Sequence, residues 1–129
     1  MPDNRYTFAR EKRIGGFNAF RPVYAARVKE YRGPLTMYAK PNDLSHPRLG
    51  ISIGRRVGIA VKRNRIKRLL RESFRLMQHD LPRGYDFVVV VAAHDPLILA
   101  DYQKLLSALA TRLHRTWEKK TSAGSSSNS

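Results

Sequence analysis

The segment VKRNRIKRLLRESFR, Val61–Arg75, combines seven basic residues with a single acidic one. So many like charges repel one another and destabilise a compact chain unless a partner neutralises them. Arginine outnumbers lysine here, and its planar fork of donors suits the oxygens of phosphate groups. The chemistry that these residues could do is therefore the binding of a polyanion, with RNA or DNA as the first candidate.

An amphipathic helix would place this charge on one face. From about Ile59 to Gln78 the apolar residues recur at helical spacing. The apolar stripe comprises Ile66, Leu69, Leu70, Ser73, Phe74 and Met77. On the opposite side of a helical wheel lie Asn64, Arg68, Arg71 and Arg75, flanked by Lys67 on one side and by Arg65 and Glu72 on the other.

The start of this helix distinguishes two interpretations of the charge. Most charge runs are solvated helix surfaces, which mix signs and place acids in the first turn. Here Lys62, Arg63 and Arg65 crowd the first turns instead. A phosphate would neutralise them and accept hydrogen bonds from the free N–H groups of the helix start, so nucleic-acid contact is favoured. Arg55 and Arg56 extend the same surface or form an ordinary basic turn.

Three aromatic residues indicate a second surface. Phe20 and Tyr24 are four residues apart, and Tyr38 lies on an expected strand, so a helix packed across the sheet could bring the three rings to one groove. Rings beside positive charge can stack on the bases of single-stranded nucleic acid. Most aromatic residues at such spacing belong to a core, and from the residues alone that alternative stays open.

Composition limits the class of protein. The 129 residues carry 25 Lys and Arg against 10 Asp and Glu, with a formal net charge of +15 and a pI near 11.0, which is typical of nucleic-acid binding. An anionic membrane surface is a distant second partner. No cysteine, secretory signal or bilayer-spanning run is present, so we expect a cytoplasmic protein.

The remaining segments predict mixed helices and strands. A helix capped by Asn18 is expected to run through Phe20 to Tyr31, with Pro22 in its first turn. Strands are expected at 35–40, 48–54 and 86–93, the last buried on both faces, and a final helix from about Asp95 to Lys120. The domain is predicted to span 17–120, between a basic arm at 1–16 and a disordered serine-rich tail at 121–129.

The stretch from Arg48 to Phe74, RLGISIGRRVGIAVKRNRIKRLLRESF, closely resembles the characteristic segment of the protein subunit of bacterial ribonuclease P. Upstream, AFRPVYAARVKEYRGPLTMYAKPN is similar to the first helix and strand of that family, with Phe20, Tyr24 and Tyr38 at its aromatic positions. Pro22 and the Ala25-Ala26-Arg27 segment depart from the family pattern.

The resemblance implies an α+β fold, an α/β sandwich similar to a ribosomal protein, with a mixed sheet and a left-handed β-α-β crossover. It implies an accessory subunit that binds the catalytic RNA and the 5′ leader of precursor tRNA. The RNA subunit, with Mg²⁺, would remove the leader. No organic cofactor and no obligate protein partner are expected. The residues that would meet the RNA subunit are Arg55, Arg56, Arg63, Asn64, Arg65, Lys67, Arg68 and Arg71. Those that would line the leader cleft are Phe20, Tyr24, Tyr38 and Ser52.

Three other functions fit the sequence less well. A self-contained nuclease would need clustered acids or histidines, and the four histidines show no metal-ligand spacing. They are His46, His79, His94 and His114. A ribosomal protein or general RNA chaperone shares the charge and size, but would not discriminate precursor tRNA. A helix-turn-helix DNA-binding protein is disfavoured because a strand follows the basic helix.

Overall fold

The computed structural model describes residues 13–127. Its elements are α1 (Gly16–Ala25), β1 (Lys29–Arg32), β2 (Leu35–Pro41), β3 (Arg48–Ile53), the 3-10 turn η2 (Arg55–Val57), α2 (Ala60–Met77), β4 (Tyr85–Val91) and α3 (Leu99–Ser127). The strands form one mixed sheet in the order β1-β2-β4-β3, in which only β3 and β4 are parallel neighbours. The expected α+β class is confirmed.

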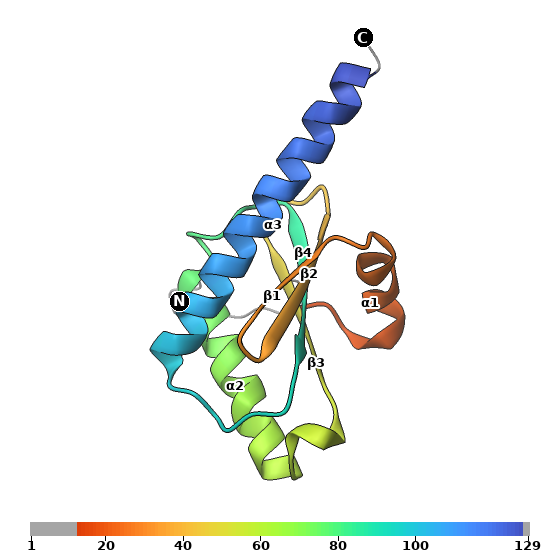
Figure 1. The fold of residues 1–129 in the computed structure, drawn as a ribbon. Helices are drawn as coiled ribbons and strands as arrows, with labels where there is room; N and C mark the ends of the chain where they lie inside the picture. Colours follow the sequence, from red (N-terminus) through yellow and green to blue (C-terminus); the bar gives the residue numbers. More distant parts are fainter. Residues whose placement is uncertain (1–12, 128–129) are drawn as a thin grey trace, which may run out of the picture.

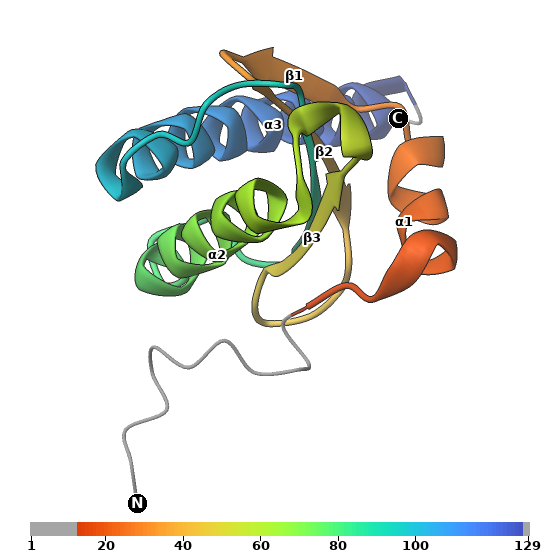
Figure 2. The same cartoon turned by 90° about the horizontal axis from the view of Figure 1, so that it is seen from below.

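Helices cover the two faces of the sheet unequally. Figures 1 and 2 show α2 and α3 side by side on one face and α1 alone on the other. Phe74, Leu109 and Phe87 are fully buried between the sheet and the helix pair. Each such side chain stabilises the fold by about 1.5–3 kcal/mol. The Trp117 indole N–H also donates to the Ala39 carbonyl at 2.9 Å, which fastens α3 to β2.

The crossover from β3 through α2 to β4 has the expected hand. When both strands point up and α2 lies in front of the sheet, β4 lies to the left of β3 (Figures 1 and 2). The connection is therefore left-handed, against the strong general preference for right-handed crossovers. The strand order places β3 at an edge of the sheet, and β3 also contacts the basic helix α2.

The helix predicted from Asn18 to Tyr31 is wrong in its second half. α1 ends at Ala25, Arg27 has a positive φ of 59°, and Lys29–Arg32 is a strand paired with β2. Gly33 and Pro34 form a two-residue hairpin loop, with Gly33 at φ 57°, and do not simply terminate a helix. The strand is favoured because its backbone groups bond to β2.

Pro22 does not lie in the first turn of α1. The helix starts at Gly16 with Gly15 at its N-cap, so Asn18 is an exposed residue within the helix and no cap. Pro22 lacks the N–H that would bond to the Asn18 carbonyl, but it still accepts a hydrogen bond from the Ala26 N–H at 3.2 Å. The proline therefore falls close to the end of a short helix.

The other predicted elements are present, with shifted boundaries. The strands and α2 lie within a few residues of their expected limits. α3 continues beyond the predicted end at Lys120 to Ser127, and so includes most of the segment whose composition predicts disorder. No proline interrupts this segment. The predicted arm lies mostly at 1–12, outside the described residues, but Ile14 at its end is buried and donates its N–H to the Leu49 carbonyl at 2.9 Å.

Candidate nucleic-acid interface

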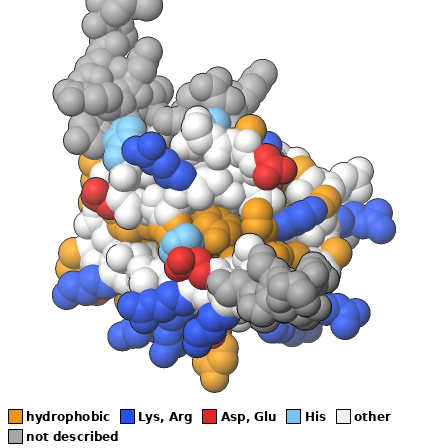
Figure 3. Space-filling view, turned by 90° about the horizontal axis from the view of Figure 1, so that it is seen from above, with side chains coloured by type: hydrophobic (Ala, Val, Ile, Leu, Met, Phe, Trp, Pro, Cys, Tyr) orange, Lys and Arg blue, Asp and Glu red, His pale blue; other side chains and the backbone are white. Residues whose placement is uncertain are grey.

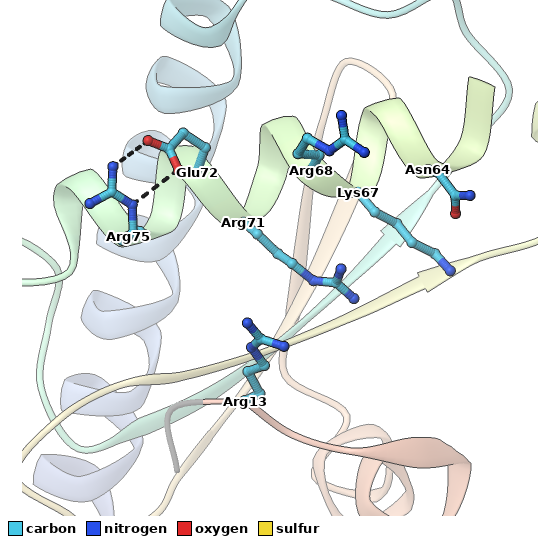
Figure 4. Close-up of a pocket in the computed structure, with 7 residues that line it drawn as sticks. All are labelled: Arg13, Asn64, Lys67, Arg68, Arg71, Glu72 and Arg75. Atoms are coloured by element: carbon cyan, nitrogen blue, oxygen red, sulfur yellow. Dashed lines mark hydrogen bonds and ion pairs between the residues drawn. The ribbon is translucent and has the colours of Figure 1, made fainter. Parts of the chain in front are cut away.

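The outer side of α2 carries the predicted basic face. A groove of about 330 Å³, called here the α2 groove, lies along it. Its lining residues are Arg13, Asn64, Lys67, Arg68, Arg71, Glu72 and Arg75. Figure 4 shows Asn64, Lys67 and Arg71 extending from α2 toward the same side. The structure therefore brings together four of the residues predicted to meet RNA, and adds Arg13 from the N-terminal segment.

Some cations of this region already have protein partners. The Arg75 side chain binds both carboxylate oxygens of Glu72, raising its own pKa and lowering that of Glu72 through these hydrogen bonds (Figure 4). The Nζ atom of Lys62 lies 3.1 Å from Oδ1 of Asp95. The Nε–H group of Arg63 donates a hydrogen bond to the Gly58 carbonyl at 3.1 Å. Arg63 thus helps to shape the loop that enters α2.

Lys67, Arg68 and Arg71 differ from these residues. No ion pair or hydrogen bond joins their side chains to another described residue, and Arg68 and Arg71 are exposed. The pKa of Arg71 is lowered, mainly by partial burial and also by the positive charge of Arg13. An anion placed in the α2 groove would raise this pKa again, because a nearby opposite charge favours the charged form of Arg71.

The other predicted basic residues lie around this groove. Arg65 contributes with Asn64 and Arg68 to an adjoining hollow of about 530 Å³. Arg55 and Arg56 are exposed in η2, immediately before α2. The predicted basic residues therefore follow the whole length of α2 and its entry loop.

The three predicted aromatic rings meet on the opposite face of the sheet. Phe20 and Tyr24 of α1 have ring centroids 6.2 Å apart, and Tyr24 and Tyr38 have centroids 4.8 Å apart, both edge to face. Lys29 places its Nζ 5.5 Å from the centroid of the Tyr38 ring. We refer to the surface formed by Phe20, Tyr24, Lys29, Tyr38 and Ser52 as the aromatic cleft. Lys29 was missed because its segment was predicted to be helical.

The members of the aromatic cleft are not equally accessible. Phe20 is only 9% exposed and packs against Gly50, where an added Cβ would come within 2.4 Å of the ring. Tyr24 and Tyr38 are half-buried. Ser52, also half-buried, pairs with Val90 one row further along the same face. Phe20 thus forms a wall, and the two tyrosines present partly open rings.

A separate hollow of about 280 Å³ lies at the end of the molecule from which α3 projects. Its lining residues are Pro41, Tyr85, Trp117, Glu118 and Thr121. Figure 3 shows hydrophobic side chains in the middle of this end, with Lys and Arg at its rim. The Nδ1 atom of His114 lies 3.0 Å from the Tyr85 hydroxyl oxygen, and its Nε2 atom lies 3.2 Å from Oε1 of Glu118. Burial raises the pKa of the Tyr85 hydroxyl group. These contacts tie α3 to β4, and no predicted site residue lies here.

Metal clusters and membrane spans are both absent from residues 13–127. No group of three or more His, Asp and Glu side chains there could hold a metal ion. No helix in that range is both long and apolar enough to cross a membrane.

Known protein sequences are similar to this chain. The sequence model of the family Ribonuclease P matches residues 8–117. The ribonuclease P protein component of Photobacterium profundum is 40% identical over 114 residues, which are 87% of this chain and 96% of that protein.

Solved structures show the same fold. The ribonuclease P protein of Staphylococcus aureus is 27% identical with a TM-score of 0.65, covering 76% of this chain and 91% of that one. That of Thermotoga maritima, in complex with 1-(4-fluorophenyl)-2-thiourea, is 26% identical with a TM-score of 0.67, covering 72% and 92%.

Proposed function

Because the chain belongs to the ribonuclease P protein family, we propose that it binds the catalytic RNA of ribonuclease P and the 5′ leader of precursor tRNA in the cytoplasm. Membership makes it an RNA-binding protein of tRNA processing and implies an RNA subunit as partner. The observation that carries the finer assignment is the pair of surfaces on opposite faces of one sheet, the α2 groove and the aromatic cleft.

The α2 groove suits the RNA subunit. Its cations are held on a rigid helix by the buried stripe that includes Ile66, Leu70 and Phe74. The planar arginine fork donates two parallel hydrogen bonds to one phosphate, so less side-chain entropy is lost for each hydrogen bond formed. A net charge of +15 also attracts a large RNA over long distances. The groove is the part of the molecule best suited to a folded RNA backbone.

The aromatic cleft suits a single strand. The half-open rings of Tyr24 and Tyr38 can stack on bases, and Lys29 lies close enough to neutralise a phosphate. Stacking requires unpaired bases, which a leader offers and a folded tRNA body largely does not. The cleft therefore accounts for recognition of precursor over mature tRNA.

We assign the hydrolysis of the phosphodiester bond to the RNA subunit with Mg²⁺. The protein supports that reaction by reducing the repulsion between two polyanions and by holding the leader in place. Both effects strengthen substrate binding, and they lower the concentration of Mg²⁺ that is needed for screening, because the ions and the protein counter the same negative charge. No group of this chain needs to contact the reacting phosphorus.

Substitution of Tyr38 by alanine tests the cleft. Since base stacking contributes about 1–3 kcal/mol per base, Tyr38→Ala is expected to raise the Kd of precursor tRNA by about five- to a hundredfold. The Kd of mature tRNA should stay within about twofold of the wild-type value, because the 5′ leader is absent. Both constants are measured for the holoenzyme assembled with a bacterial ribonuclease P RNA, without cleavage.

Tyr38→Phe is the matched control, because it keeps the ring and removes only the hydroxyl group. It should bind precursor nearly as well as the wild type. If Tyr38→Ala weakens precursor and mature tRNA equally, the leader assignment is wrong and the chain retains only a general role in RNA binding.

A further inference from the structure

An exposed aromatic residue lies on the edge strand β1. Tyr31 is the last residue of the helix predicted for this segment, but in the structure it belongs to the strand and its side chain is 75% exposed. Lys29 and Tyr31 are two residues apart on the strand, so they share one face of the sheet. Because Lys29 reaches the Tyr38 ring, that face is the one that carries the aromatic cleft. Tyr31 therefore lies beside the cleft without belonging to it.

The strand register places Tyr31 at one end of a row of side chains that crosses the sheet. In order across β1, β2, β4 and β3, this row consists of Tyr31, Thr36, Val90 and Ser52, and we call it the Tyr31 row. Adjacent strands are about 4.8 Å apart, so the row is roughly 14 Å long. Ser52 also belongs to the aromatic cleft, so the row and the cleft form one continuous surface.

Helix α1 covers the neighbouring row of the sheet and leaves the Tyr31 row open. Its side chains pack on Tyr38, Val88 and Gly50, which are opposite one another in that neighbouring row. Val88 is fully buried there, whereas Val90 is the one residue of β4 that is only half-buried. Figure 1 shows the end of β3 extending beyond α1. The Tyr31 row is therefore the accessible part of this face.

The side chains of the row suit a nucleotide. An exposed phenol ring offers a face on which any base can stack. Thr36 and Ser52, both half-buried, carry hydroxyl groups that can bond to base edges or to a ribose 2′-OH group. Lys29 is exposed on the same face and supplies positive charge for a phosphate, whereas Glu30 lies on the other face. Charge and shape thus favour a single strand of RNA.

We propose that Tyr31 is a second stacking platform, which binds one further base of the single-stranded leader beyond the base held by Tyr24 and Tyr38. This inference rests on the proposed function and extends the leader-binding surface from the aromatic cleft across the Tyr31 row. Tyr31 and Tyr38 are diagonal neighbours on paired strands, which places them about 7–8 Å apart. The two rings can therefore hold different bases of one extended strand.

The test combines removal of the ring with removal of single bases. Precursor tRNAs are prepared with an abasic nucleotide at one leader position at a time, and their Kd values are measured with wild-type, Tyr31→Thr and Tyr38→Ala holoenzymes. Threonine lacks the ring but keeps a β-branched side chain that suits a strand. Tyr31→Thr is expected to weaken unmodified precursor by about fivefold, the lower end of the range for base stacking, and mature tRNA by less than about twofold.

The abasic series identifies the base that each ring holds. One abasic position should weaken wild-type binding by the same factor as Tyr31→Thr and have no further effect on that variant. A different position should have no further effect on Tyr38→Ala. If one position accounts for both tyrosines, there is no second platform and the inference is overturned.

Tyr31→Phe and Ile98→Ala are the matched controls. The first keeps the ring, and the second removes another exposed apolar side chain, which is 68% exposed before α3. Because Tyr31→Phe keeps the stacking face and Ile98 lies in neither surface, both variants should bind precursor within about twofold of the wild type.

Two further results would overturn the inference. One is that Tyr31→Thr binds precursor as the wild type does; the other is that it weakens mature tRNA, or the RNA subunit alone, as much as precursor. If Tyr38→Ala also fails to distinguish precursor from mature tRNA, the proposed function fails as well. The expected response to Tyr38→Ala with none to Tyr31→Thr contradicts the inference alone.

Discussion

Replacement of Lys67, Arg68 and Arg71 by glutamine is expected to weaken binding to ribonuclease P RNA by on the order of a hundredfold or more. These three side chains line the α2 groove and lack ion pairs within the described chain. The slope of log K against log salt should also fall by about 0.9 for each phosphate that the variant no longer binds. Filter binding over a range of salt concentrations measures both quantities.

A control with the same loss of charge separates local contacts from general attraction. The triple replacement of Arg112, Arg115 and Lys119 by glutamine removes three exposed cations from α3. We expect it to weaken binding by less than about tenfold through the reduced net charge alone. Equal weakening by the two triple variants would show that the α2 groove has no special role.

Replacement of Asp86 by alanine is expected to lower the free energy of unfolding by about 1.5–3 kcal/mol, the range for hydrogen bonds to a charged group. Asp86 is buried at the start of β4 and accepts hydrogen bonds from Arg48 Nε at 2.7 Å and Nη2 at 2.5 Å, and from the Asn42 amide at 2.8 Å. The hydrogen bond to Asp86 raises the pKa of Arg48. In the Asp86→Ala variant the guanidinium group would still be charged but would have lost its carboxylate partner. Urea unfolding followed by circular dichroism gives the change.

Asp43→Ala is the comparison for this residue, because Asp43 is an exposed acid in the same β2–β3 connection as Asn42. Its positive φ of 59° is strained for alanine, so a loss of about 1 kcal/mol is expected. A loss from Asp86→Ala no larger than this would show that the Arg48–Asp86 ion pair contributes little to stability.

The basic helix could be predicted because one pattern determines both its structure and its surface. The stripe through Ile66, Leu70 and Phe74 must face the core, which leaves the arginines on the outside. The convergence of Phe20, Tyr24 and Tyr38 was also expected, but the residues alone could not separate core from cleft. The structure shows an intermediate case, with Phe20 packed against Gly50 and the tyrosines half open.

The segment from Arg27 to Arg32 could not be predicted from periodicity. Tyr24, Arg27 and Tyr31 fit a helical repeat, whereas β1 has four residues and depends on bonds to β2. Such short strands carry little local signal, because their stability comes from pairing. The Gly33-Pro34 pair was the available indication of a hairpin.

Two further features depend on contacts between distant parts of the chain. The bridge between Arg13 and Leu49 joins the N-terminal segment to an edge strand, and nothing in the local sequence specifies that pairing. The left-handed connection through α2 was expected only from the family resemblance, because the general rule favours the other hand. Arg13 was therefore absent from the predicted sites.

Cleavage of precursor tRNA by a bacterial ribonuclease P RNA at low magnesium, with and without this protein, tests the proposed function. We expect the RNA alone to be nearly inactive at low magnesium and the protein to restore cleavage at the correct 5′ position. If the RNA is active at high magnesium and binds the protein, yet the protein does not restore cleavage at low magnesium, the proposed role in leader removal is contradicted.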